Sequence, residues 1–148
     1  QIRDYALKNF DITLIDCPPN LGTFSLQAMI ASDFVIVPVE AGSRYATDGL
    51  DRTVSTIEEI ATTEGIGQSG IFLRLVINKA DRRTTVSKVT IDQVNEIYND
   101  KVFKNIIPIN TDIQQSELLG KTVIRHASKS KGSQAFRKLA HELLDILK

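Results

Sequence analysis

An aspartate that directly follows a short apolar run is the first residue of this sequence with a recognisable chemical use. Residues 12–15 are apolar and mostly β-branched, which predicts a buried strand, and Asp16 comes immediately after them. A carboxylate at the end of such a strand can hold Mg²⁺, directly or through water, while substrate phosphates supply further ligands. Pro18 and Pro19 stiffen the loop that follows, and Gly22 allows a phosphate to approach the backbone closely. The alternative is that Asp16 only caps a turn, and the pattern alone leaves both roles open.

Two further pairs of candidate residues follow later apolar runs. Asn78 and Asp81 come after the third run, and Pro108 and Asn110 come after the fourth. Amide and carboxylate groups at the end of a strand can read the hydrogen-bond donors and acceptors of a purine edge. Asparagine and aspartate are also common in turns for backbone reasons alone, so a nucleotide-binding role and a turn role both stay open.

The phosphate-binding loop G-x-x-x-x-G-K-[ST] is absent from these 148 residues. Such a loop needs glycines whose backbone amides surround the phosphates and a lysine that reaches them. Gly65 and Gly67 are expected to end a helix, whereas a phosphate loop precedes one. Gly120-Lys121-Thr122 supplies the last three letters, but two leucines precede it where a glycine-rich turn belongs. Neither segment is expected to bind phosphate in this way.

A cysteine nucleophile has little support. Cys17, the single cysteine, stands beside Asp16, but a reactive thiolate would need a histidine partner. The two histidines, His126 and His141, lie in late segments that are expected at the surface. We expect Cys17 to pack within its loop. One cysteine also excludes an internal disulfide framework, and two histidines leave little for a zinc site.

Positive charge is concentrated at the end of a chain that is neutral overall. Lysine plus arginine and aspartate plus glutamate each number 18, so no bulk charge drives the chain onto nucleic acid or membrane. Residues 1–119 carry 11 basic and 16 acidic residues, a net charge of −5, and residues 120–148 carry 7 basic and 2 acidic residues, a net charge of +5. This end is either a solvated cationic helix or a contact to a polyanion. Arg82 and Arg83 pose the same choice between a solvated loop and a phosphate contact.

Alternating strands and helices are expected to position these residues. Apolar runs predict strands over residues 12–15, 34–39, 71–77 and 106–107, and helical spacing predicts helices over residues 2–9, 21–31, 45–64, 85–99, 112–119 and 131–147. Val86, Val89, Val94 and Ile97 are expected to form the apolar side of the fourth of these helices. The alternation predicts an α/β fold, a parallel sheet flanked by helices, with ligands bound beyond the carboxyl ends of the strands. None of the apolar runs approaches the roughly 20 residues of a membrane span.

Six motifs together make the chain resemble the ParA/MinD-type partition ATPases, and the ParA branch more closely than MinD. They are D-C-P-P-N-L-G at residues 16–22, F-V-I-V-P-V at 34–39, the loop at 78–84, I-P-x-N at 107–110, G-K at 120–121 and K-S-K-G at 129–132. Their order and approximate spacing match over nearly all of the chain. The resemblance implies a P-loop NTPase-like fold of the SIMIBI type. It also implies that residues 1–148 form the C-terminal part of one nucleotide-binding domain, with the phosphate loop upstream and the sheet incomplete at its N-terminal side.

The activity of the family is implied for this chain through that resemblance. Such proteins bind ATP and Mg²⁺, form homodimers face to face around the nucleotide, and bind DNA non-specifically as the ATP-bound dimer. A ParB-like centromere-binding protein stimulates hydrolysis, and the cycle segregates plasmids or chromosomes. The resemblance therefore implies a cytoplasmic, nucleoid-associated bacterial protein that does not use a membrane. Because the sequence contains no phosphate loop, we expect this chain alone not to hydrolyse ATP.

Individual residues take family roles where they match its motifs. Asp16 matches the catalytic carboxylate near Mg²⁺ in the switch II loop, and the rest of that loop is matched by Pro18, Pro19 and Gly22. Asn78 matches the residue next to the adenine, and the loop that begins at Pro108 matches the wall beside the base. The nucleotide-binding set implied for this chain is therefore Asn78, Asp81, Pro108 and Asn110.

The chain matches the family's DNA-binding residues only in part. Arg83 with Thr84 matches the family's Arg-Thr pair before a helix. Many relatives carry an arginine two residues after the asparagine of I-P-x-N, but this chain has Asp112 there, which reverses the charge. The contacts to DNA are therefore expected from Arg83 and from four cations of the basic end, Lys129, Lys131, Arg137 and Lys138.

Two other interpretations compete with a partition ATPase. A short paralogue without catalysis would keep DNA or partner contacts and act as a binding module. An iron–sulfur relative of the nitrogenase iron protein type would need two cysteines per subunit for a cluster between subunits, and Cys17 alone does not suffice.

Overall fold

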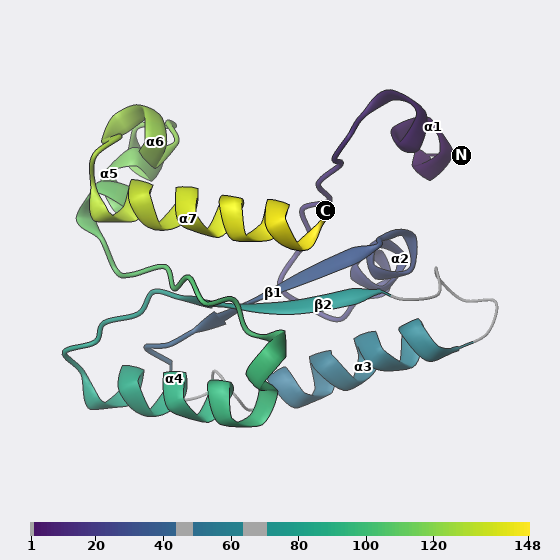
Figure 1. Cartoon of the computed structure of the whole chain (residues 1–148), viewed down its shortest axis with the longest axis horizontal. Coiled ribbons are helices and arrows are strands. Elements are labelled where there is room, and N and C mark those ends of the chain that lie inside the picture. Colours follow the sequence, from purple (N-terminus) through teal and green to yellow (C-terminus); the bar gives the residue numbers. More distant parts are fainter. Residues whose placement is uncertain (1, 44–48, 64–70) are drawn as a thin grey trace. The chain divides into compact units, whose positions relative to one another are not determined.

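The computed structural model describes residues 2–43, 49–63 and 71–148, and Figure 1 shows their helices and strands. The chain divides into two compact units. The first unit comprises residues 1–35 and 52–73, and the second comprises residues 36–51 and 74–148. The predicted start of the long helix at Tyr45, its predicted end at Glu64, and the glycines Gly65 and Gly67 lie outside the described residues.

The first unit is helical. It contains α1 (Ile2–Asn9), α2 (Thr23–Ala31) and most of α3 (Leu50–Thr62). Arg3 of α1 joins the end of α2, because its guanidinium donates to the carbonyl of Ala31 at 2.8 Å and to both carboxylate oxygens of Asp33 at 2.7 and 3.1 Å. This arginine also lowers the pKa of Asp33 through its hydrogen bonds. The helix predictions over 2–9 and 21–31 are therefore confirmed, the second two residues late.

The strand predicted over residues 12–15 is not formed. Residues 11–20 are all exposed and have no regular secondary structure, and the Leu14 side chain is 84% exposed. A strand persists only where a neighbour satisfies its backbone N–H and C=O groups. The regular sheet of the described residues contains β1 and β2 alone, so nothing in it pairs with this segment.

The second unit is built on a parallel sheet. β1 (Phe34–Glu40) and β2 (Phe72–Asn78) are its regular strands, and at their carboxyl ends the Ala41 N–H donates to the Asn78 carbonyl at 2.9 Å. Residues 102–109 continue the sheet beside β2 through parallel bridges from Leu75 to Val102 and from Ala80 to Pro108. The strand predicted at 106–107 thus pairs with β2 through the Ile107 N–H, but it is not part of a regular ladder.

Helices flank this sheet, as the α/β prediction required. They are α4 (Thr85–Tyr98) with the short 3-10 helix η1 (Asn99–Lys101), then α5 (Thr111–Leu118), α6 (Val123–His126) and α7 (Lys131–Ile146). The core includes Leu75, Ile77 and Val94, which are fully buried. The fold class, an α/β parallel sheet flanked by helices, is confirmed.

The apolar side predicted for α4 is wrong. Of the four predicted residues only Val94 is buried, whereas Val86, Val89 and Ile97 are 49%, 47% and 61% exposed. The helix instead buries Ser87, Thr90, Val94 and Tyr98. This face is selected by hydrogen bonds, because Ser87 Oγ accepts the Asp81 N–H and the Tyr98 hydroxyl donates to Asp51.

The G-K-T letters at residues 120–122 encode a helix end followed by a helix start. Gly120 has φ +60°, its N–H donates to the Glu117 carbonyl, and the Lys121 N–H donates to the Ser116 carbonyl. This is a Schellman motif with glycine at the left-handed position that ends α5. Thr122 then accepts the Arg125 N–H and begins α6. The segment is therefore not a phosphate loop, as the sequence predicted.

Candidate functional site

The four residues predicted to bind nucleotide lie at one edge of the second unit. The Ala80 N–H donates to the Ile107 carbonyl at 3.0 Å, and the Ile109 N–H donates to the Ala80 carbonyl at 3.1 Å. This pairing places the turn at residues 78–81 beside residues 108–110. The set of Asn78, Asp81, Pro108 and Asn110 is therefore brought together at the carboxyl ends of neighbouring segments, which is where ligands bind in sheets of this kind.

The side-chain amides of this edge already have structural partners. Asn78 Oδ1 accepts the N–H of Lys79, a residue at φ +51°, and so supports the turn that leaves β2. Asn110 Oδ1 accepts the Ile113 N–H at 3.3 Å and begins α5. Both turn roles that the sequence left open are thus present. Neither amide nitrogen donates a hydrogen bond within the part of the chain that the structure describes.

The Asp81 side chain accepts more hydrogen bonds than any of the other three residues of the edge. Its Oδ1 accepts from Arg83 Nε at 2.9 Å and from the Arg83 N–H at 3.0 Å, and its Oδ2 accepts from Arg83 Nη2 at 2.8 Å. These hydrogen bonds lower the pKa of Asp81 to about 2, so the carboxylate is charged at neutral pH. A nucleotide-binding candidate and a DNA-binding candidate are therefore paired with each other.

The predicted switch II loop lies in the first unit. Asp16 is exposed, and the loop after it is closed by the Asn20 side chain, whose Oδ1 accepts the Gly22 N–H at 3.0 Å. A Cβ on Gly22 would lie 2.8 Å from that oxygen, so a larger residue here would displace the Asn20 side chain. The buried Ser25 hydroxyl donates to the Pro18 carbonyl at 3.4 Å and holds the loop against α2. The exposed carboxylate of Asp16 thus lies just before a constrained turn.

Metal ligation by protein groups alone is not supported in the part of the chain that the structure describes. No three His, Cys, Asp or Glu side chains there group closely enough to hold a metal ion. One exposed carboxylate such as Asp16 still suits Mg²⁺, which keeps several waters and takes substrate phosphates as ligands. Cys17 next to it is exposed, with its Sγ 3.8 Å from the Ile15 carbonyl, and the expected packing of the thiol is not seen.

The predicted DNA-binding cations of the basic end lie just before α7 and along its first half. Lys129 lies in the preceding turn, and Lys131, Arg137 and Lys138 are on the helix. All four are exposed, and none forms an ion pair with a described carboxylate. Ser130 accepts the Ser133 N–H at 3.1 Å and fixes the start of the helix. The four charges are therefore carried on a well-defined element and are free to meet an external anion.

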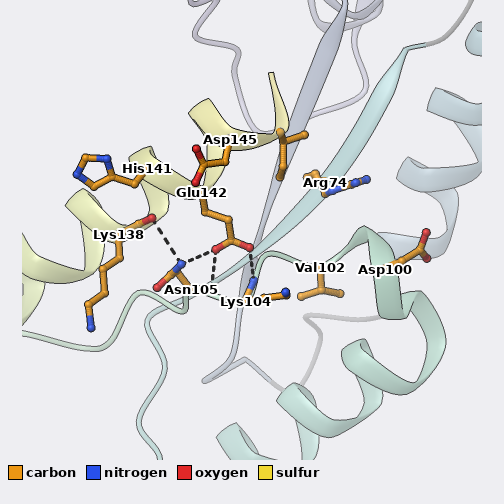
Figure 2. Close-up of a pocket in the computed structure, with 10 residues that line it drawn as sticks. Arg74, Asp100, Val102, Lys104, Asn105, Lys138, His141, Glu142 and Asp145 are labelled. Atoms are coloured by element: carbon orange, nitrogen blue, oxygen red, sulfur yellow. Dashed lines mark hydrogen bonds between the residues drawn. The ribbon is translucent and has the colours of Figure 1, made fainter. Parts of the chain in front are cut away.

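A pocket of about 590 Å³ lies elsewhere in the second unit, between α7 and residues 102–105 (Figure 2). It is lined by Arg74, Asp100, Val102, Lys104, Asn105, Lys138, His141, Glu142, Asp145 and Ile146. Only Lys138 among these was predicted as a site residue. The lining mixes both signs of charge, so it favours no class of ligand.

Glu142 at the centre of this pocket is an anchor that the sequence analysis did not identify. Its carboxylate accepts the Lys104 N–H at 2.7 Å, the Asn105 N–H at 3.0 Å and Asn105 Nδ2 at 2.5 Å, as Figure 2 shows. These two backbone N–H groups therefore donate to α7 and not to β2. An acidic side chain between Leu139 and Leu143, on the half-buried side of an amphipathic helix, was the available signal.

Replacing Glu142 with alanine should lower the free energy of unfolding by about 1–3 kcal/mol, because two backbone donors and an amide lose their acceptor. Urea unfolding followed by circular dichroism measures the change. Asp145→Ala is the matched control, since it removes from the same helix an exposed carboxylate that pairs with Lys148 at 2.8 Å. Equal effects of the two substitutions would show that Glu142 is not an anchor.

Comparison with known proteins finds a matching family model and similar proteins. A family model described as an AAA domain matches residues 2–69. The chain is 32% identical to the chromosome-partitioning ATPase Soj of Thermus thermophilus, over 93% of this chain and 54% of the relative. It is 30% identical to the sporulation initiation inhibitor protein Soj of Bacillus subtilis, over 92% and 53%, and 33% identical to the chromosome partitioning protein ParA of Caulobacter vibrioides, over 91% and 49%. The chain thus spans about half the length of these relatives.

A solved structure supports the same fold. The chain superposes with a TM-score of 0.69 and 29% identity on cobyrinic acid a,c-diamide synthase from Mycobacterium smegmatis, a structure with bound ADP and magnesium. The match covers 96% of this chain and 53% of that one. This likeness agrees with the predicted P-loop NTPase-like fold type. No helix in the described part of the chain is both long and apolar enough to cross a membrane.

Proposed function

Because this chain belongs to the ParA/MinD-type family of partition ATPases, we propose that it is the C-terminal part of a ParA-like nucleotide-binding domain that works in plasmid or chromosome partition. The observation that carries the proposal is 30–33% identity to two Soj proteins and a ParA over more than nine-tenths of the chain. The nucleotide is ATP with Mg²⁺, and the structural neighbour's ADP and magnesium support this class of ligand.

The residues divide into two sets for this function. Asp16, which precedes the turn fixed by Asn20 and Gly22, would hold Mg²⁺ directly or through water, and that ion would neutralise phosphate charge when bound. The edge of the second unit, formed by Asn78, Asp81, Pro108 and Asn110, would lie against the base. The Asn78 and Asn110 oxygens support the turns, and their amide nitrogens would donate to acceptors of the purine.

The DNA-binding and assembly steps are the remaining parts of the proposal. The chain would bind DNA non-specifically through Arg83 and the four cations just before α7 and along its first half, as part of a nucleotide-dependent homodimer. A ParB-like protein would stimulate hydrolysis in a cytoplasmic, nucleoid-associated complex. The absence of a G-x-x-x-x-G-K-[ST] motif from the 148 residues favours one alternative, a binding module that keeps these contacts without catalysis.

Titration calorimetry with Mg²⁺-ATP tests the proposal. We expect no hydrolysis by the 148-residue chain alone. We also expect binding that is much weaker than that of a longer protein in which a phosphate loop precedes the same residues. Asp16→Asn in the longer protein should reduce the Mg²⁺ dependence of binding. Tight binding of Mg²⁺-ATP by the 148-residue chain itself would contradict the requirement for such a loop. A natural gene that encodes only these residues would favour the binding module.

A further inference from the structure

Arg83, one of the proposed DNA contacts, is already held by a carboxylate within the same loop. Its guanidinium gives Asp81 two roughly parallel hydrogen bonds, from Nε to Oδ1 and from Nη2 to Oδ2, at 2.9 and 2.8 Å. This is the geometry in which a guanidinium also binds a phosphate. A phosphate that uses the same two N–H groups must therefore displace the carboxylate.

Of the two partners, the arginine is the one that can leave. The Asp81 N–H donates to Ser87 Oγ at 3.1 Å, and the Asp81 carbonyl accepts from the Thr84 N–H and from Thr84 Oγ1, both at 3.0 Å. Ser87 is fully buried, so the backbone of Asp81 is fixed from both sides. The Arg83 side chain is 89% exposed, whereas that of Asp81 is 19% exposed.

We propose that Asp81 is an intramolecular competitor of DNA, which masks Arg83 until a nucleic-acid phosphate displaces its carboxylate. The proposal rests on the DNA contact assigned to Arg83 above. Duplex DNA is a suitable competitor because its phosphates are closely spaced and their neutralisation releases counterions. Asp81 then sets how much Arg83 adds to non-specific binding, in addition to any part it takes at the nucleotide edge.

Substitution of Asp81 separates masking from a general change in charge. We expect Asp81→Asn to bind a fluorescently labelled DNA duplex at least about threefold more tightly than the wild-type chain at 0.1 M salt. The slope of log K against log salt should steepen by up to about 0.9, the value for one added phosphate contact. Asp92→Asn is the matched control, because Asp92 is an exposed carboxylate of α4 with no partner among the described residues. It should change the affinity less and leave the slope unchanged.

A second background makes the test specific to Arg83. In Arg83→Ala, which should bind more weakly than the wild type, Asp81→Asn should add no more than Asp92→Asn does. If Arg83→Ala weakens binding but Asp81→Asn does not strengthen it beyond the control, masking is wrong and the DNA contact stands. If Asp81→Asn weakens binding, Asp81 positions Arg83 and does not mask it. If Arg83→Ala has no effect, or the chain binds neither duplex DNA nor immobilised heparin, the contact and the masking both fail.

Loss of folding is checked separately. Circular dichroism and urea unfolding of each variant show whether the loop substitution disturbs the unit. Arg83→Lys provides a second route that leaves Asp81 intact, because lysine keeps the charge but cannot form the two-bond fork. Masking predicts that this variant binds DNA at least as tightly as the wild type, and weaker binding would contradict it.

Discussion

An alanine at position 132 should destabilise the protein, although alanine is the better helix former. Gly132 is a buried residue in the first turn of α7, and a Cβ there would lie 2.6 Å from Ile113 Cγ1 and 2.8 Å from Asn110 Oδ1. Such crowding costs about 1–3 kcal/mol, and displacement of the Asn110 cap of α5 adds about 1 kcal/mol. The gain in helix propensity is at most about 1 kcal/mol. We expect a net loss of about 1–3 kcal/mol in the free energy of unfolding.

Urea unfolding of Gly132→Ala and Gly132→Val measures this loss, and valine should cost more because it adds two further carbons. Gly42→Ala is the matched control, since a Cβ at this exposed glycine would have no atom within 4 Å. We expect the control to change stability by no more than about 0.5 kcal/mol. An alanine variant as stable as the wild type would show that α5 and α7 can separate without cost.

Most helices were predictable because their signals are local. The caps Asn110 and Ser130 each accept the N–H three residues ahead, and Gly120 supplies the left-handed residue that ends α5. Each of these signals involves residues within one or two turns of the helix they begin or end. The predicted bounds of α1, α5 and α7 consequently agree with the structure to within one residue.

The predictions of a strand at residues 12–15 and of the buried face of α4 were wrong for the opposite reason. An apolar run becomes a strand only if another segment pairs with it, and a sequence pattern does not say which segment does so. In α4 the valines predicted an apolar face, but the helix is oriented by two hydrogen bonds. The Asp81 N–H donates to Ser87 Oγ, and the Tyr98 hydroxyl donates to Asp51. Hydrogen bonds between elements therefore decide which face of α4 is buried, whatever the number of apolar residues on its other faces.

The candidate site also contains some contacts that the sequence could predict and one that it could not. The gathering of residues 78–81 and 108–110 was predictable, because carboxyl ends of parallel segments meet at one edge. The Asp81–Arg83 pair was within reach of the sequence, since only one residue separates its partners. The Glu142 anchor was not, because its three hydrogen bonds join residues 37 and 38 positions apart.

Removal of the four cations just before α7 and along its first half should nearly abolish DNA binding by the chain. The variant is Lys129→Gln, Lys131→Gln, Arg137→Gln and Lys138→Gln. If each cation contacts one phosphate, the slope of log K against log salt falls by up to about 3.5, and the affinity at 0.1 M salt falls by about 10³-fold. No acidic residue lies between Glu117 and Glu142, so nothing along this segment offsets its charge. Fluorescence anisotropy across a salt series measures both quantities.

The control separates a binding surface from bulk charge. Lys8, Arg52, Lys88 and Lys148 are also three lysines and one arginine, all exposed, but they are spread over α1, α3, α4 and the last residue. Changing these four to glutamine alters the net charge equally and should leave the salt slope nearly unchanged. Equal losses of DNA affinity in the two variants would show that the basic end is only a solvated cationic helix. A loss confined to the first variant requires a local surface, because only clustered cations meet neighbouring phosphates at once.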